Sequence, residues 1–186
     1  MKRVFFIFLA LCVIAPFSLE AKKKAFGNGL YWELTEDGTL TISGNGRMPD
    51  FRWKKTPWYA KRKKINNIVF EEGITYVGEK AFDFRAKVLE FDIHYINKIV
   101  IPKSLQEIGR DAFRGICPQK TMISDLKLYC QIKDNGSCRS VNKLYLNNLE
   151  VKDLIIPFGT KSIPPSAFEC SGLTSVSIPN SVTSIE

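Results

Sequence analysis

The stretch INKIVIPKSLQEIGRDAF, from Ile96 to Phe113, decides the fold because its spacing of apolar residues occurs twice more in the chain. INNIVFEEGITYVGEKAF (Ile65 to Phe82) and VKDLIIPFGTKSIPPSAF (Val151 to Phe168) follow the same template, and LTSVSIPNSVTSIE from Leu173 is a partial fourth copy. Only Thr160 breaks the apolar template. A spacing that recurs along a chain is the signature of a repeat architecture.

Each copy predicts two short strands and a turn. Ile-x-Ile precedes Pro102 in one copy, and such a segment predicts a strand that ends at proline. LQEIG predicts a second strand, and DAF predicts a turn that inserts Phe into the core. The inward residues of this copy are Ile96, Ile99, Ile101, Leu105, Ile108, Ala112 and Phe113. The predicted fold class is mainly β, a right-handed solenoid in which each copy forms one coil and short parallel strands stack between coils.

The first 21 residues have the composition of a secretory signal peptide. Lys2 and Arg3 form a basic start, residues 4–14 form an apolar run too short to favour a spanning helix, and Ala21 suits a cleavage site. We therefore expect an exported chain with no membrane span after cleavage. The expected divisions are a signal peptide at 1–21, an N-terminal cap at 22–64 and repeats at 65–186.

A β-hairpin is predicted within YWELTEDGTLTISGNG, residues 31–46. A three-residue loop, Glu36-Asp37-Gly38, places Leu34 opposite Leu40 and Trp32 opposite Ile42, so that all four apolar residues share one face. A repeat array needs its open end covered, and the hairpin is well placed to cover it as a cap.

The repeats are interrupted by an irregular insertion at about residues 114–150, which contains one degenerate coil. We predict a strand at Thr121–Ile123 and then a short helix with Ser124 as its N-cap. KLYLNNLEVKDLII then alternates Leu144, Leu146 and Leu149 into the next coil. Residue 186 falls partway through a coil, and no polar cap follows that coil, so we expect a fragment with further repeats downstream.

These residues resemble the BspA-type leucine-rich repeat family. LTSVSIPNSVTSIE matches the family's repeat nearly letter for letter, and LYWELTEDGTLTISGNGRMPDF followed by TPWY is similar to its N-terminal cap. MISDLKLYC followed by LYLNNLEVKDLIIP resembles an insertion found in its bacterial members. The resemblance covers about residues 29–186. It implies a leucine-rich-repeat solenoid in a secreted or cell-surface protein whose repeats bind other proteins or host matrix, and it supplies no catalytic residue.

No catalytic or metal-binding constellation is visible in the sequence. His94 is the single histidine, Asp and Glu are scattered singly, and no phosphate-binding loop of the Gly-Lys-Ser/Thr kind occurs. We therefore expect no enzyme activity, no metal and no cofactor. The cysteines beyond the signal peptide permit two disulfides, with the pairing left open: Cys117, Cys130, Cys138 and Cys170.

The strands predict a candidate protein-binding face. Because Ile99 and Ile101 point inward, Val100 points outward, and Val69 and Ile155 occupy the same position in their copies. The three form a predicted exposed apolar row, and an apolar stripe with a polar rim is typical of a protein-binding surface. The flanking polar candidates are Asn67, Lys98 and Asp153. The alternative is that branched residues suit strands even when they are exposed.

A second candidate is RWKKTPWYAKRKK, residues 52–64, which contains no acidic residue. Its basic residues are Arg52, Lys54, Lys55, Lys61, Arg62, Lys63 and Lys64. They suit a glycan or another polyanion, with Trp53 or Trp58 stacking on a ring, whereas the structural alternative has Trp58 and Tyr59 closing the cap. Export disfavours intracellular nucleic acid as a partner. Adhesion to host or matrix proteins through the strand face is the primary hypothesis, and polyanion binding through residues 52–64 is the alternative.

Overall fold

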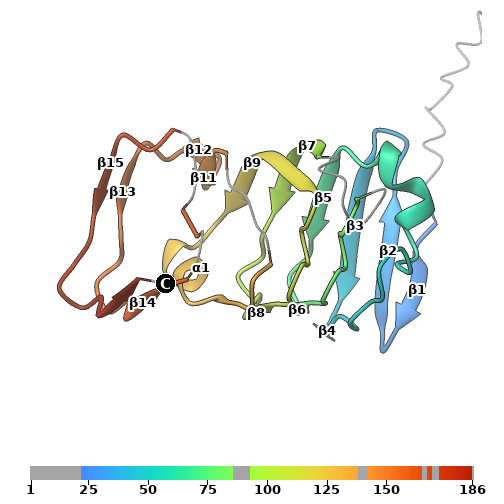
Figure 1. Cartoon of the computed structure of the whole chain (residues 1–186), viewed down its shortest axis with the longest axis horizontal. Coiled ribbons are helices and arrows are strands. Elements are labelled where there is room, and N and C mark those ends of the chain that lie inside the picture. The colour runs from blue at the N-terminus through green and yellow to red at the C-terminus, as the bar shows by residue number, and fades with distance from the viewer. Residues whose placement is uncertain (1–21, 86–92, 138–141, 165–166, 169–171, 186) are drawn as a thin grey trace, which may run out of the picture.

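The chain forms a stack of coils, with longer strands on one side of the stack and shorter strands on the other side (Figure 1). The structure is a computed structural model that describes residues 22–85, 93–137, 142–164, 167–168 and 172–185. The coils follow one another along the long axis from the N-terminal to the C-terminal part of the chain. This arrangement confirms the predicted mainly β solenoid with parallel strands.

The long sheet has eight strands in the order β1-β2-β3-β5-β7-β9-β11-β12. Their bounds are Lys24–Gly27 (β1), Leu30–Leu34 (β2), Thr39–Gly44 (β3), Asn67–Phe70 (β5), His94–Val100 (β7), Ile116–Ile123 (β9), Leu144–Leu146 (β11) and Leu149–Glu150 (β12). Strands β3, β5, β7, β9 and β11 are parallel neighbours. The β2–β3 hairpin pairs Leu34 with Leu40 and Trp32 with Ile42, which confirms the predicted register.

The opposite side of the stack carries much shorter strands. The four-stranded sheet has the order β10-β8-β6-β4, formed by Lys133–Asp134 (β10), Glu107–Ile108 (β8), Ile74–Val77 (β6) and Gly46–Arg47 (β4). A six-residue 3-10 helix, Tyr59–Lys64 (η1), lies between the cap and the first coil in sequence, and the α-helix α1 spans Leu126–Cys130. Each predicted second strand is present, and each is only two to four residues long.

The last two coils form sheets of their own. Asp153–Ile155 (β13) pairs with Ser175–Ser177 (β15), and Ser162–Ile163 (β14) pairs with Ser184–Ile185 (β16). Within the described ranges, no ladder joins β13 to β12 or β14 to β10. Grooves of about 490 and 480 Å³ lie at these two breaks. The hydroxyl of Tyr129 donates to the Ala167 carbonyl at 3.2 Å, which ties the two parts of the stack together.

Aromatic rings fill the coil interiors and stack along the axis. The rings of Phe82 and Phe113 lie 5.6 Å apart at 13°, and Trp58 stacks on Phe82 from the cap side at 5.3 Å and 18°. All three side chains are buried. Thr160, the exception to the template, is buried as well, and its hydroxyl donates to the Pro157 carbonyl at 2.8 Å. The repeated Phe therefore occupies the predicted core position, and a hydroxyl is tolerated where its hydrogen bond is made locally.

Two expectations for the insertion were wrong in detail. The N-cap of α1 is Asp125 rather than Ser124, and its carboxylate accepts from the Leu128 N–H at 2.9 Å. Leu149 does not face the next coil: it is 75% exposed, because β11 and β12 form an antiparallel hairpin. The turn residues Asn147 and Asn148 both have positive φ, at 50° and 68°. Two such residues favour a tight hairpin turn, so Asn-Asn was the signal for this reversal.

Polar side chains connect successive coils on the short-strand side. Arg47 donates to Glu107 at 2.8 Å, and its guanidinium carbon lies 3.9 Å from the centre of the Tyr76 ring between them. Asn135 donates to the other carboxylate oxygen of Glu107 at 2.9 Å. The hydrogen bond from Arg47 has the largest effect and that from Asn135 the next largest, and together they hold the pKa of Glu107 below its usual value.

Phe113→Ala should lower the free energy of unfolding by about 3–5 kcal/mol, because removing a stacked, buried ring leaves a cavity between two coils. Thermal melts followed by circular dichroism measure the loss. Phe158→Ala is the matched control, since the Phe158 side chain is 81% exposed and its removal should change the melt little. Equal melts for both variants would show that the ring of Phe113 does not support the stack.

Glu107→Gln should weaken the protein at neutral pH and leave it nearly unchanged in acid. A carboxyl whose pKa falls on folding stabilises the fold above its ordinary value of 4.5, and the contribution is lost as the pH drops through the lowered pKa. Because Arg47 is 58% exposed, we expect only about 0.5–1 kcal/mol. Urea unfolding at pH 7 and pH 3 tests this, with Glu36→Gln on the exposed hairpin loop as the control. An equal loss at both pH values would contradict the assignment.

Candidate protein-binding face

The outward side of the long sheet carries rows of side chains in strict register. Alternation along β5 buries Ile68 and Phe70 and leaves Asn67 and Val69 facing outward. The same pattern holds in the neighbouring coils. Cross-strand pairing then aligns one outward residue from each of five strands, which we name the central row: Thr41, Val69, Val100, Met122 and Tyr145. All five are partly exposed.

The structure brings only part of the predicted apolar row together. Val69 and Val100 are direct cross-strand partners, as predicted, and Asn67 is aligned with Lys98 beside them. Ile155 does not belong to this sheet: it lies on β13, which pairs only with β15 among the described strands. Ile155 is 69% exposed and lines the groove of about 490 Å³ between β12 and β13. The β11–β12 hairpin therefore separates Ile155 from the central row.

Asp153, the third polar candidate, is on the same separate pair of strands. Its carboxylate accepts from the Ser175 hydroxyl at 2.7 Å and from the Thr174 hydroxyl at 2.8 Å. The hydrogen bond from Ser175 has the largest effect and that from Thr174 the next largest, and together they keep the pKa of Asp153 below its usual value. Asp153 is thus engaged with the neighbouring coil as well as exposed.

Thr41, Met122 and Tyr145 are the members of the central row that were not predicted from the sequence. Met122 stands between Thr121 and Ile123, both buried, in a segment that was predicted as a strand. Alternation alone would have assigned it an outward position. Tyr145 required the pairing of β11 with β9, which the irregular insertion hides in the sequence. Its hydroxyl donates to Glu150 at 3.1 Å.

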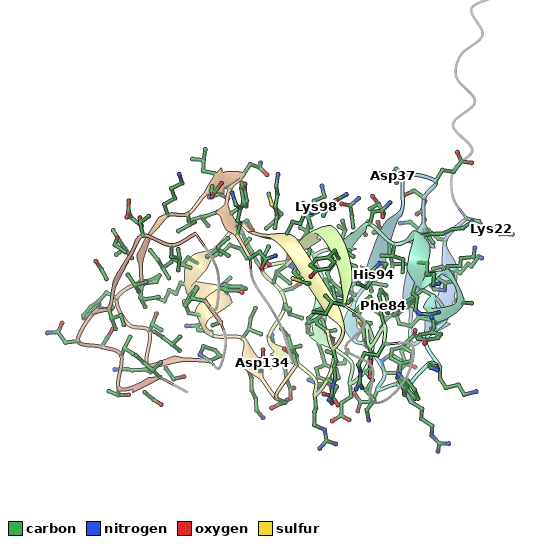
Figure 2. All side chains as sticks on the ribbon, turned by 45° about the horizontal axis from the view of Figure 1, so that its top comes forward. Lys22, Asp37, Phe84, His94, Lys98 and Asp134 are labelled. Carbon is green, nitrogen blue, oxygen red and sulfur yellow. The ribbon has the colours of Figure 1, made fainter. Side chains whose placement is uncertain are left out.

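A second row next to the central row is basic. Lys98 is the direct partner of Lys120, and Lys143 follows on the next coil, where its carbonyl accepts from the Thr121 N–H at 2.8 Å. We name Lys98, Lys120 and Lys143 the basic row. Lys98 and the hairpin residue Asp37 lie along one side of the molecule, whereas Asp134 lies on the opposite side (Figure 2).

The lysines of the basic row have closer charge and ring partners the nearer they lie to β12. Lys98 has no ion-pair partner within the described part of the chain, and the ammonium of Lys120 lies 5.3 Å from the centre of the Tyr145 ring. Lys143 lies 3.2 Å from the Glu150 carboxylate. Hydrogen bonds from Lys143 and Tyr145 lower the pKa of Glu150, so this carboxylate remains charged beside the row.

A shallow hollow of about 340 Å³ borders the central row at the carboxyl ends of the strands. Val100 and Met122 line its inner side, and Asn147, Asn148 and Glu72 line its outer side. The Glu72 carboxylate accepts from the N–H groups of residues 103 and 104 at 2.9 and 3.1 Å. The apolar residues therefore sit beside a depression with a hydrogen-bonded polar rim.

Residues 52–64 close the N-terminal end of the core. Trp58 is fully buried, its Nε1 donates to the Ala81 carbonyl at 2.9 Å, and its ring meets Trp32, Phe26 and Phe51 edge-on at 5.4–6.2 Å. Tyr59 donates to the Arg85 carbonyl at 3.0 Å. The structural reading of Trp58 and Tyr59 is confirmed, and a stacking role for Trp58 on a ligand ring is wrong because the ring is not accessible.

The basic side chains of this segment divide into two groups. Arg62 packs over the Tyr59 ring at 4.2 Å, and Lys54 packs over the Trp53 ring at 4.1 Å. Lys54 is nevertheless exposed, as are Arg52, Lys55, Lys61, Lys63 and Lys64. Helix η1 brings four consecutive basic residues, 61–64, into its last turn.

His94 and Cys117, which could carry chemistry, make contacts within the fold. The Nε2 of His94 donates to the Ile65 carbonyl at 2.9 Å, and the His94 ring packs edge-on against Phe84 at 5.6 Å (Figure 2). Asn142 donates to the Cys117 sulfur at 3.4 Å. Cys138 and Cys170 lie outside the described residues, so the disulfide pairing stays open. Among the residues with described positions, no three His, Cys, Asp or Glu side chains are grouped as metal ligands.

In the part of the chain that the structure covers, no helix is long and apolar enough to cross a membrane. The predicted signal peptide, residues 1–21, lies outside it.

Comparison with solved structures finds two leucine-rich repeat proteins. One is a leucine-rich repeat protein from Eubacterium ventriosum ATCC 27560, at 16% identity and a TM-score of 0.40, with 86% of this chain and 60% of that chain covered. The other is a leucine rich cell surface protein from Faecalibacterium prausnitzii A2-165, at 19% identity and a TM-score of 0.34, with 88% and 44% covered. The present chain thus spans less than two thirds of either protein. No curated protein matches it.

Family assignment rests on a sequence model of the repeat itself. The model described as BspA type Leucine rich repeat region matches in 6 copies, over residues 58–132 and 89–186. These matches include every coil from η1 to β16 and cover more than half of the chain. The chain belongs to the BspA-type leucine-rich repeat family.

Proposed function

We propose that this chain is a non-enzymatic protein-interaction module that adheres to host or matrix proteins through the outward face of its long sheet. The observation that carries the proposal is the central row, in which Val69, Val100 and Met122 lie side by side on a rigid parallel sheet and are partly exposed. Apolar side chains within a polar rim are typical of the centre of a protein interface. Family membership supports a role in protein binding.

We also propose that the chain is exported and acts at the cell surface or outside the cell. The apolar run at residues 4–14 behind Lys2 and Arg3 supports this location. The Faecalibacterium prausnitzii relative in fold is described as a cell surface protein, which agrees with the same location.

Binding of a glycan or another polyanion through residues 52–64 is the second candidate function. The exposed Lys61, Lys63 and Lys64 on one short helix favour it, because adjacent ammonium groups attract closely spaced anionic groups. Trp58 gives it no support, since its buried ring cannot stack on a sugar.

A single charge on the central row tests the primary proposal. Val100→Lys should reduce binding to a panel of immobilised matrix proteins by at least about tenfold, because a charge at an interface centre is desolvated without a partner. The same side chain can extend into solvent in the free protein, so the circular dichroism spectrum and melt should stay close to those of the parent.

The matched control changes Lys61, Arg62, Lys63 and Lys64 together to Ser. On the sheet-face proposal this cap variant keeps its binding. Loss of binding in the cap variant alone, with both variants folded, would overturn the sheet-face proposal and favour the polyanion function.

A further inference from the structure

The basic row brings three like charges together: Lys98 and Lys120 are direct partners on adjacent parallel strands, and Lys143 stands one position before β11, whose first residue pairs with Thr121. Neighbouring strands are about 4.8 Å apart, and like charges in this position destabilise a sheet. Among the residues that the structure describes, partial compensation lies toward one end: Lys143 pairs with Glu150, and Lys120 approaches the Tyr145 ring. Lys98 is aligned with Lys120 on one side and with the uncharged Asn67 on the other. The fold therefore keeps a repulsion that a neutral residue at position 120 would remove.

The basic row and the central row run parallel along the solenoid axis. Lys98 and Val100 are two positions apart on β7, and Lys120 and Met122 are two positions apart on β9, so each strand presents one member of each row on the same face. The hollow of about 340 Å³ lies on the far side of the central row. The lysines of the basic row thus lie on one flank of the central row, and the hollow lies on its other flank.

From this juxtaposition we propose that the face binds an acidic, amphipathic helix of a partner protein, laid along the solenoid axis with its carboxylates on the basic row and its apolar stripe on the central row. The inference rests on the sheet-face function proposed above and names the chemistry of the partner.

The repeat distance of an α-helix is close to the spacing between the coils of the solenoid. An α-helix advances 5.4 Å per turn, close to the spacing of about 4.8 Å between strands, so each helical turn meets one coil. Side chains at i and i+4 follow one another along one helix stripe and meet successive coils. The two rows are about 6.6 Å apart along a strand, close to the distance of about 5–6 Å between neighbouring side chains on a helix surface.

The negative groups around the face define how the helix lies on it. Glu33 stands beside Thr41 at the hairpin end of the central row, and Glu150 stands beside Tyr145 at the other end. Glu72 lies across the hollow. These carboxylates repel an acidic stripe from the central row and the hollow, so the stripe is favoured only over Lys98, Lys120 and Lys143.

Lys120→Glu separates the effect on folding from the effect on binding. It converts two repulsive cross-strand contacts into attractive ones with Lys98 and Lys143, so the melting temperature should rise by about 1–4 °C. The same change puts a negative charge in the middle of the basic row and should weaken binding at least about tenfold. Lys161→Glu, at an exposed lysine before β14 on the other side of the stack, is the charge-matched control.

The probe is a fluorescently labelled synthetic peptide of about 20 residues, long enough to be helical, with Glu and Leu in two adjacent stripes. A peptide of the same composition in scrambled order and fluorescein-labelled heparin are measured beside it by anisotropy on the full chain. We expect the striped peptide to bind more tightly than the scrambled one, Lys120→Glu and Val100→Lys to lose that binding, and the cap variant and Lys161→Glu to keep it.

The outcomes distinguish this inference from the function on which it rests. If the striped peptide does not bind, or binds Lys120→Glu as well as the parent, the acidic-helix inference is overturned. If Val100→Lys then still loses matrix-protein binding, the sheet-face function stands without it. Heparin binding that Lys120→Glu abolishes, with no preference for the striped peptide, would show instead that the basic row recognises a polyanionic glycan.

Discussion

The stacking of aromatic rings along the solenoid axis is the interaction on which the rest of the structure depends. Trp58, Phe82 and Phe113 form a continuous series of near-parallel rings, one from the cap and one from each of the next two coils. Each ring fills the interior of its own coil and contacts the next, so the coils cannot shift relative to one another without losing packing on both sides. Strand register, and with it the alignment of outward side chains, follows from this constraint.

Rigid alignment explains why a sheet of such short strands can present a defined surface. Each coil alone has too little apolar area to be stable, and neighbouring coils bury it for one another. The outward residues do not contribute to that burial, so their identity can change without loss of the core. The central row and the basic row occupy these positions, where Met122 or Lys120 can be selected for interactions outside the chain.

The sequence contained enough information for the coils but too little for the insertion. The spacing of Ile, Leu and Phe predicted the inward faces and the outward position of Val100, because alternation in a strand is a local property. The hairpin register followed from the position of Gly38 in its loop, where φ is +81°. Ile155 was misplaced because strand pairing between coils is set by the whole path of the chain, including the turn at Asn147 and Asn148. The pairing of Lys143 with the row depended on that same path.

The alignment of charged side chains could not be predicted from the sequence either. Lys98, Lys120 and Lys143 are 22 or 23 residues apart in the chain, and nothing in their local surroundings relates them. Only the parallel stacking of β7, β9 and β11 aligns them. The same holds on the opposite side, where Arg47 donates to Glu107 although the two residues are 60 positions apart in the chain.

The interruption between β12 and β13 divides the stack into two parts, and the joint between them differs from the joints within each part. From Thr41 to Tyr145 the outward face is one continuous sheet, and bending it would break backbone hydrogen bonds. At the interruption, within the described ranges, the coils are joined by side-chain contacts such as those of Tyr129 with Ala167 and Phe168, with a groove on either side. Bending at this joint would disturb side-chain packing and the Tyr129 hydrogen bond, but no strand ladder between the described residues. Such bending would change the angle of Ile155 and Asp153 relative to the central row without opening the sheet that runs from Thr41 to Tyr145.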